Sequence, residues 1–171
     1  LQEKFDLVKS KLVAFTHSKQ EVKAIYSGES NMDLYANAII SYLSGNHSES
    51  LEILNKLIDR APNNPYFREL LGEIYFARAD FDNAIKNQSI ALELINEPSD
   101  LYFMMIGSYL IALEDQVSKN DGIKNLKKSI FINPKNTYSW YLLARAYADT
   151  DNLPLANYAT AERYYLIGER S

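Results

Sequence analysis

Apolar residues recur along most of the chain at intervals of three and four positions, the spacing of one face of an α-helix. One small residue marks each strongly periodic segment: Ala38, Gly72, Gly107 and Ala144. These four are separated by 34, 35 and 37 residues. A second set of small residues lies between them, with spacings of 34, 38 and 34 residues: Ser50, Ala84, Gly122 and Ala156. Two interleaved sets with a period near 34 residues predict an array of helix–turn–helix units, whose small residues let paired helices approach closely.

The 171 residues then divide into an N-terminal helical cap at 1–30 and four units at about 31–64, 65–99, 100–136 and 137–170. Pairs that contain proline separate the units: Asn64-Pro65, Glu97-Pro98 and Asn133-Pro134. Asn64 is placed to cap a helix that has Pro65 at its first position, and Asp80 and Asn136 can cap the helices that follow them. The third unit has about three extra residues near Val117–Asn120, which we expect in the turn between its two helices.

The fourth unit has the most specific pattern. Its successive key residues are Trp140, Leu143, Ala144, Tyr147 and Ala156. This order resembles the W-x2-L-G-x2-Y … A pattern of the tetratricopeptide (TPR) repeat family. The resemblance implies an all-α fold: a right-handed superhelical solenoid of about four TPR units with N-terminal capping helices. Because one helix pair cannot bury its own apolar face, neighbouring units must stack, and Trp140 is expected to be buried.

The residues before the units contain a row at helical spacing, formed by Phe5, Val8, Leu12 and Phe15. The row predicts one helix at about 2–15, and a shorter helix is expected at about 19–27. Since an end repeat leaves an apolar face uncovered, we expect these helices to cover the first unit.

Composition excludes several functional classes. A formal net charge of −4, from 18 basic and 22 acidic side chains, argues against a nucleic-acid partner. The chain has no cysteine, and its two histidines are 30 residues apart, so no metal or other cofactor is expected in it. No His-Glu-x-x-His, phosphate-binding loop or nucleophile motif is present, which indicates that this chain is not an enzyme. The most apolar run, Leu101–Leu113, is shorter than the ~20 residues of a membrane span.

Two acidic residues, Glu69 and Glu73, lie four positions apart on one predicted helix. This pair favours a solvated or ion-paired helix face, with a ligand contact as the second interpretation and acid–base catalysis as a remote third.

The stripe at positions 2, 5, 9 and 12 of each unit's first helix lines the inner, concave surface of a TPR solenoid. We call this the inner stripe, and its candidate binding residues are Met32, Tyr35, Ile39, Tyr42, Tyr66, Glu69, Glu73, Phe76, Met104, Ser108, Tyr138, Tyr141 and Arg145. Tyrosine, methionine and large aliphatic residues predominate, which is typical of a surface that binds a protein or peptide partner. Two alternatives remain equal: the groove is open to a ligand, or a terminal helix or the rest of a longer protein fills it. The Lys, Arg and Asn clamp that holds chaperone tails is absent.

Three longer stretches carry a narrower resemblance: Phe5–Leu12, Asn64–Gly72 and Asp151–Arg163. They are similar to the C-terminal TPR domain of bacterial envelope zinc metallopeptidases of the β-barrel assembly-enhancing type. The resemblance implies a non-catalytic recruiting domain in the periplasm, attached to a catalytic domain that holds zinc. Its implied partners are outer-membrane proteins, their assembly machinery and the catalytic domain itself.

A free-standing TPR adaptor or co-chaperone in the cytoplasm is the alternative. Because Leu1 is not an initiator methionine, the sequence favours the metallopeptidase interpretation.

Overall fold

The structure is a computed structural model that describes residues 2–168. Every element in that range is helical, and the elements follow one another as α1 (Gln2–Thr16), α2 (Lys19–Ile25), α3 (Asn31–Leu43), α4 (His47–Arg60), α5 (Pro65–Ala77), α6 (Phe81–Ile95), α7 (Asp100–Ile111), α8 (Gln116–Ile132), α9 (Thr137–Ala148) and α10 (Leu153–Gly168). Residue 1 of the predicted cap and residues 169–170 of the predicted fourth unit lie outside the described part. The all-α class is confirmed.

Side-chain caps define where the helices begin. Asn64 accepts a hydrogen bond from the backbone N–H of Tyr66 and is followed by Pro65 at the first helical position. Asp80 and Asn136 cap α6 and α9 in the same manner, as the sequence predicts. These caps satisfy backbone N–H groups that the first turn of a helix leaves without partners.

The small residues of the two repeating sets bring the helices of a pair together. The Oγ of Ser50 donates a 2.7 Å hydrogen bond to the carbonyl of Ala38, which joins α4 to α3. A Cβ atom on Gly107 would lie 2.7 Å from the Cγ of Leu126, and one on Gly122 would lie 2.5 Å from the Cγ2 of Ile111. The pair α7–α8 therefore packs at a distance that only glycine permits.

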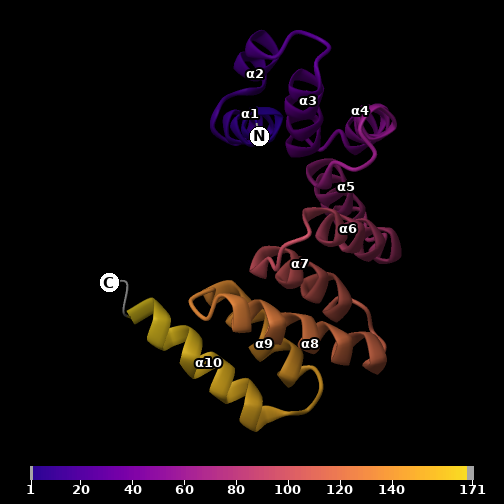
Figure 1. The fold of residues 1–171 in the computed structure, drawn as a ribbon. Helices are drawn as coiled ribbons and strands as arrows, with labels where there is room; N and C mark the ends of the chain where they lie inside the picture. The colour runs from indigo at the N-terminus through magenta and orange to yellow at the C-terminus, as the bar shows by residue number, and fades with distance from the viewer. Residues whose placement is uncertain (1, 169–171) are drawn as a thin grey trace.

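The four helix pairs form a curved stack, with α1 beside α3 on the side away from α4 (Figure 1). Two groups of buried side chains make up the core. One extends from α1 to α5 and includes Tyr35 and Phe67; the other extends from α7 to α10 and includes Leu126 and Trp140. Trp140 is buried as expected, and its indole N–H donates to the carbonyl of Pro134 at 2.8 Å.

The structure corrects two expectations. The N-terminal helices cover the first unit as expected, since α1 packs on α3, but not through the predicted apolar row, because Phe5, Val8, Leu12 and Phe15 are 50–63% exposed. The buried face of α1 consists of Leu7, Ser10 and Ala14. These side chains are mostly small, so α1 lies close against α3.

The extra residues of the third unit also differ from expectation. Val117–Asn120 lie at the beginning of α8 and lengthen that helix, whereas a longer turn was expected. Asp115 makes this possible because its carboxylate caps α8 by accepting from the backbone N–H of Ser118 at 2.8 Å. No helix among residues 2–168 is both long and apolar enough to cross a membrane.

Candidate functional site

The inner stripe is divided into two halves that differ in exposure. In units one and two, every predicted stripe residue is buried or half-buried; we call these the covered half: Met32, Tyr35, Ile39, Tyr42, Tyr66, Glu69, Glu73 and Phe76. In units three and four, we call the predicted residues the open half: Met104, Ser108, Tyr138, Tyr141 and Arg145. Tyr138, Tyr141 and Arg145 are exposed, and Met104 and Ser108 are half-buried. The first half of the stripe is therefore covered and the second is exposed, and ligand binding by the inner stripe stays a prediction.

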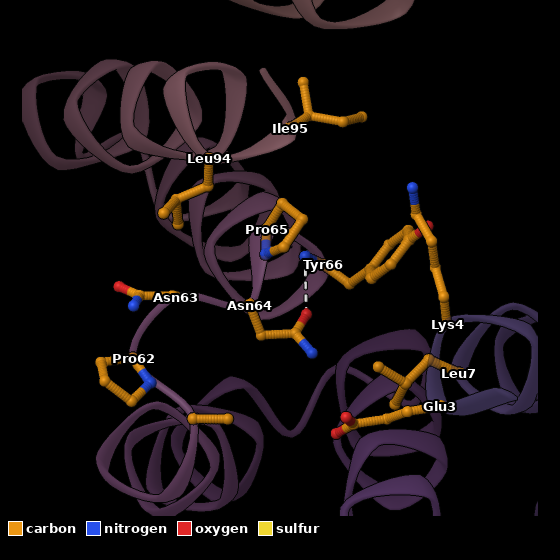
Figure 2. A pocket seen from close by; sticks show the side chains of 11 residues that line it. Glu3, Lys4, Leu7, Pro62, Asn63, Asn64, Pro65, Tyr66, Leu94 and Ile95 are labelled. Atoms are coloured by element: carbon orange, nitrogen blue, oxygen red, sulfur yellow. Dashed lines mark hydrogen bonds between the residues drawn. The ribbon is translucent and has the colours of Figure 1, made fainter. Parts of the chain in front are cut away.

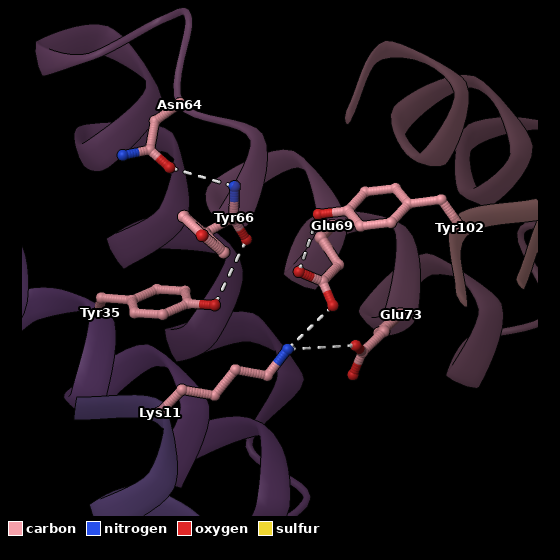
Figure 3. A network of polar contacts seen from close by, with 7 residues as sticks. All are labelled: Lys11, Tyr35, Asn64, Tyr66, Glu69, Glu73 and Tyr102. Atoms are coloured by element: carbon pink, nitrogen blue, oxygen red, sulfur yellow. Dashed lines mark hydrogen bonds and ion pairs between the residues drawn. The ribbon is translucent and has the colours of Figure 1, made fainter. Parts of the chain in front are cut away.

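In the covered half, a lysine of α1 meets the two carboxylates of α5. The Nζ atom of Lys11 lies 2.9 Å from an Oε1 of Glu69 and 4.0 Å from an Oε1 of Glu73 (Figure 3). The other carboxylate oxygen of Glu69 accepts a 3.2 Å hydrogen bond from the hydroxyl of Tyr102 on α7. Three helices distant in sequence are thus joined through Glu69, which is only 4% exposed.

Charge in this cluster is not balanced, because two carboxylates share one ammonium group. Burial raises the pKa of Glu73 to about 7; the pull of Lys11 opposes this shift and repulsion from Glu69 adds to it. Burial by itself would lower the pKa of Lys11, but attraction to Glu69 and Glu73 outweighs burial and raises it. Burial, followed by the charge of Glu73, also raises the pKa of Tyr42 and Tyr109. The cluster is suited to holding a cation.

These contacts favour the ion-paired interpretation of the Glu69–Glu73 spacing. Lys11 itself was missed by sequence reasoning, and no local signal could have found it, because 58 residues separate it from Glu69. Among residues 2–168, no group of three or more His, Cys, Asp and Glu side chains is arranged to hold a metal ion.

The open half presents aromatic rings together with cations. The rings of Tyr138 and Tyr141 stack with centroids 5.8 Å apart. The guanidinium of Arg163, on α10, lies 5.2 Å from the centroid of the Tyr141 ring and 5.7 Å from that of Tyr164. Arg145 is paired at 3.8 Å with Asp149 on its own helix. The inner stripe was predicted from first helices alone, so the contribution of Arg163 from a second helix was missed.

Two hollows lie where α1 meets α5. One, of about 490 Å³, is lined by α1, the turn before α5 and the end of α6, and includes Leu7, Pro62, Tyr66 and Ile95 (Figure 2). The other is lined by Tyr66 and by α1, including Phe5 and Val8 of its outward row. Tyr66 borders both hollows, so α1 and the inner stripe form one continuous surface at this point.

Comparisons with solved structures agree on the architecture. MamA from Desulfovibrio magneticus RS-1 superimposes with a TM-score of 0.80 at 14% identity, covering 98% of this chain and 96% of that one. Cut9, solved in the APC/C hetero-tetramer Cut9–Hcn1, superimposes with a TM-score of 0.79 at 15% identity, covering 94% of this chain and 32% of that one. Both are TPR proteins. The fold is a TPR solenoid.

At these identities the comparisons show the TPR fold alone. No family model matches the sequence, and no curated protein matches it. The narrower resemblance to envelope metallopeptidases stays a prediction.

Proposed function

We propose that this chain is a non-catalytic TPR module that binds a protein or peptide partner, with the open half of the inner stripe as the binding surface. The observation that supports this most directly is exposure. Tyr138 and Tyr141 are 53% and 41% exposed, whereas Tyr35 and Ile39 on the equivalent stripe of unit one are fully buried. Large side chains left exposed together on an inner face are characteristic of partner surfaces.

The side chains of the open half are suited to bind a partner segment that carries apolar or aromatic side chains and some negative charge. Tyr138 and Tyr141 offer ring faces, and Met104 offers an adaptable apolar contact. Arg163 adds positive charge over the Tyr141 ring, and Arg145, four positions after Tyr141 on α9, adds a second guanidinium that is paired with Asp149. Cut9 is solved as a hetero-tetramer with Hcn1, which provides an example of a solenoid of this shape in a complex with another protein.

Site-specific photo-crosslinking in the source cells tests this proposal. With benzoylphenylalanine in place of Tyr141, we expect a crosslinked partner, and the Tyr138→Ala substitution in the same chain should reduce the yield. The matched control carries the photo-reactive residue in place of Phe131 on α8, which is 88% exposed and lies outside the inner stripe. Crosslinks of equal yield and mass from both positions would contradict the proposal.

A second candidate places the module in a zinc metallopeptidase of the bacterial envelope, where it would recruit outer-membrane proteins or their assembly machinery. The resembling stretches Asn64–Gly72 and Asp151–Arg163 support it. A free-standing adaptor fits the solenoid neighbours at least as well.

The mass and the zinc content of the protein purified from its source cells separate the two candidates. A larger zinc-containing peptidase in the periplasm supports the recruiting domain. A protein of about this chain's 19.6 kDa in the cytoplasm, without zinc, supports the adaptor.

A further inference from the structure

We propose that the covered half of the inner stripe is a second binding site, selective for a helix that carries a lysine, and that α1 is its exchangeable internal occupant. This inference rests on the proposed function, namely that the inner face of the module binds protein. It adds the chemistry of a partner and a means by which the chain itself regulates access.

The position of α1 shows how such a helix is held. Leu7, Ser10 and Ala14 lie one helical turn apart and face α3, each 0–1% exposed. Lys11 lies beside this face and extends to α5, where it reaches Glu69 and Glu73 (Figure 3). The site therefore holds a helix by two features: a close-packed contact with α3 and an ion pair between one lysine and the two carboxylates.

The carboxylate pair makes the cation a requirement. Glu69 is 4% exposed, and its remaining oxygen is already engaged by the hydroxyl of Tyr102. An occupant without a positive charge would leave the buried Glu69 and the half-buried Glu73 close together with no opposite charge beside them, which disfavours their charged forms. A lysine suits the site because its long apolar stem passes the close-packed contact before its ammonium group meets the carboxylates.

The α1 helix leaves much of its apolar surface exposed, so another helix could replace it. Its largest apolar side chains, including Phe5 and Leu12, face outward and are 63% exposed. Its inward face consists of Leu7, Ser10 and Ala14 with the partly buried Val13 beside them, so its largest apolar side chains stay outside the contact. A partner helix with a lysine and small residues at the same spacing, whose larger apolar side chains also contact the module, would bury more area and could displace α1.

The chemistry of the partner follows from the spacing on α1. It is a helix with leucine four positions before the lysine, a small residue immediately before it and a small residue three positions after it, as at Leu7, Ser10, Lys11 and Ala14.

A peptide with the sequence of residues 2–16 is the probe, and it is added in fluorescently labelled form to the full chain carrying Lys11→Met. This substitution keeps the apolar stem and removes the cation of the internal occupant. We expect the peptide to bind with a Kd about tenfold lower than that of a control peptide with methionine in place of its own lysine. Adding Glu69→Gln and Glu73→Gln to the chain should remove the preference. Circular dichroism establishes that each variant is folded.

Amide hydrogen exchange on the unsubstituted chain gives an independent test. Excess peptide should accelerate exchange in α1 and leave α3 protected, because the peptide takes the place of α1 on α3. If the peptide binds neither the unsubstituted chain nor the Lys11→Met chain, α1 is a fixed part of the fold and the inference is overturned. Equal affinity of the two peptides, or binding without faster exchange in α1, would also overturn it. The crosslinking at Tyr141 is unaffected by these outcomes, so failure here leaves the proposed function standing.

Discussion

At the scale of single residues, Glu73 shows what tertiary packing does to an ordinary surface-type side chain. In the unfolded chain its carboxyl ionises near the usual value of 4.5, and in the fold burial raises its pKa to about 7. Lys11 offsets burial only partly, because its Nζ atom is 4.0 Å away and lies closer to Glu69. The half-paired carboxylate is therefore a local cost to stability whenever it is charged.

The sign of the pH dependence follows from this shift. Between about pH 4.5 and pH 7 the folded state binds more protons at Glu73 than the unfolded state does, so this group makes stability fall as pH rises. Replacing Glu73 with glutamine removes that fall. We expect Glu73→Gln to gain about 2–4 kcal/mol of stability relative to the unsubstituted chain between pH 5 and pH 8, seen as a larger free energy of unfolding.

Urea unfolding of both chains at the two pH values measures this difference. Glu52→Gln on α4 is the matched control, since Glu52 is exposed. A Glu73→Gln variant with the same relative stability at both pH values would contradict the shift.

At the scale of helices, the closeness of α7 and α8 depends on two glycines that face one another across the pair. Glycine within a helix is disfavoured by about 1 kcal/mol relative to alanine, so its presence calls for a packing reason. The clashes that added Cβ atoms would make supply this reason, because Leu126, which meets Gly107, is fully buried and has little room to move. The sequence pattern marks these positions as small, and the structure shows which of them must be glycine.

Alanine substitutions at these positions are expected to follow the order of the clashes. Gly107→Ala and Gly122→Ala should each lower the free energy of unfolding by about 1–2 kcal/mol, since overpacking outweighs the gain in helix propensity. Gly72→Ala should cost less, because its Cβ would lie no closer than 3.2 Å to Ala84 and Gln88. Thermal unfolding of the three variants gives the ranking, and a Gly107→Ala variant more stable than Gly72→Ala would show that this pair can separate.

At the scale of the whole molecule, the solenoid has two groups of core residues, one at each end of the stack. In a solenoid each unit contacts mainly its neighbours, so a substitution that destabilises one end has only a weak effect on the stability of the other end. Trp140 belongs to the second group, where its ring also meets the edge of Tyr158 at a centroid distance of 5.9 Å.

Replacing Trp140 with alanine should therefore cost about 3–5 kcal/mol in the units that surround it. Hydrogen exchange resolved by residue should show lost protection in α8–α10 and nearly unchanged protection in α3 and α4. Uniform loss of protection along the chain would indicate one cooperative unit in place of two loosely coupled ends.

The arrangement of the inner face is also a property of the whole molecule. The local pattern identified Tyr35, Glu69 and Tyr141 as members of one stripe, and the structure separates them into a covered half and a half open to solvent. Binding through either half remains a prediction that the proposed crosslinking and peptide experiments test. Local periodicity could not make this division, because it depends on where a helix distant in sequence lies.

The sequence by itself determined the helix pairs, their period, the caps at Asn64 and Asn136 and the burial of Trp140. These features depend on contacts within a helix or between adjacent helices, and such contacts require particular residue types at regular intervals along the sequence. Only the tertiary structure decided that α1 packs through Leu7, Ser10 and Ala14 with its apolar row outward, and that Lys11 meets Glu69. The physical reason is that amphipathic spacing identifies the faces of a helix, whereas the choice of face depends on the shape and charge of the surface that the helix meets.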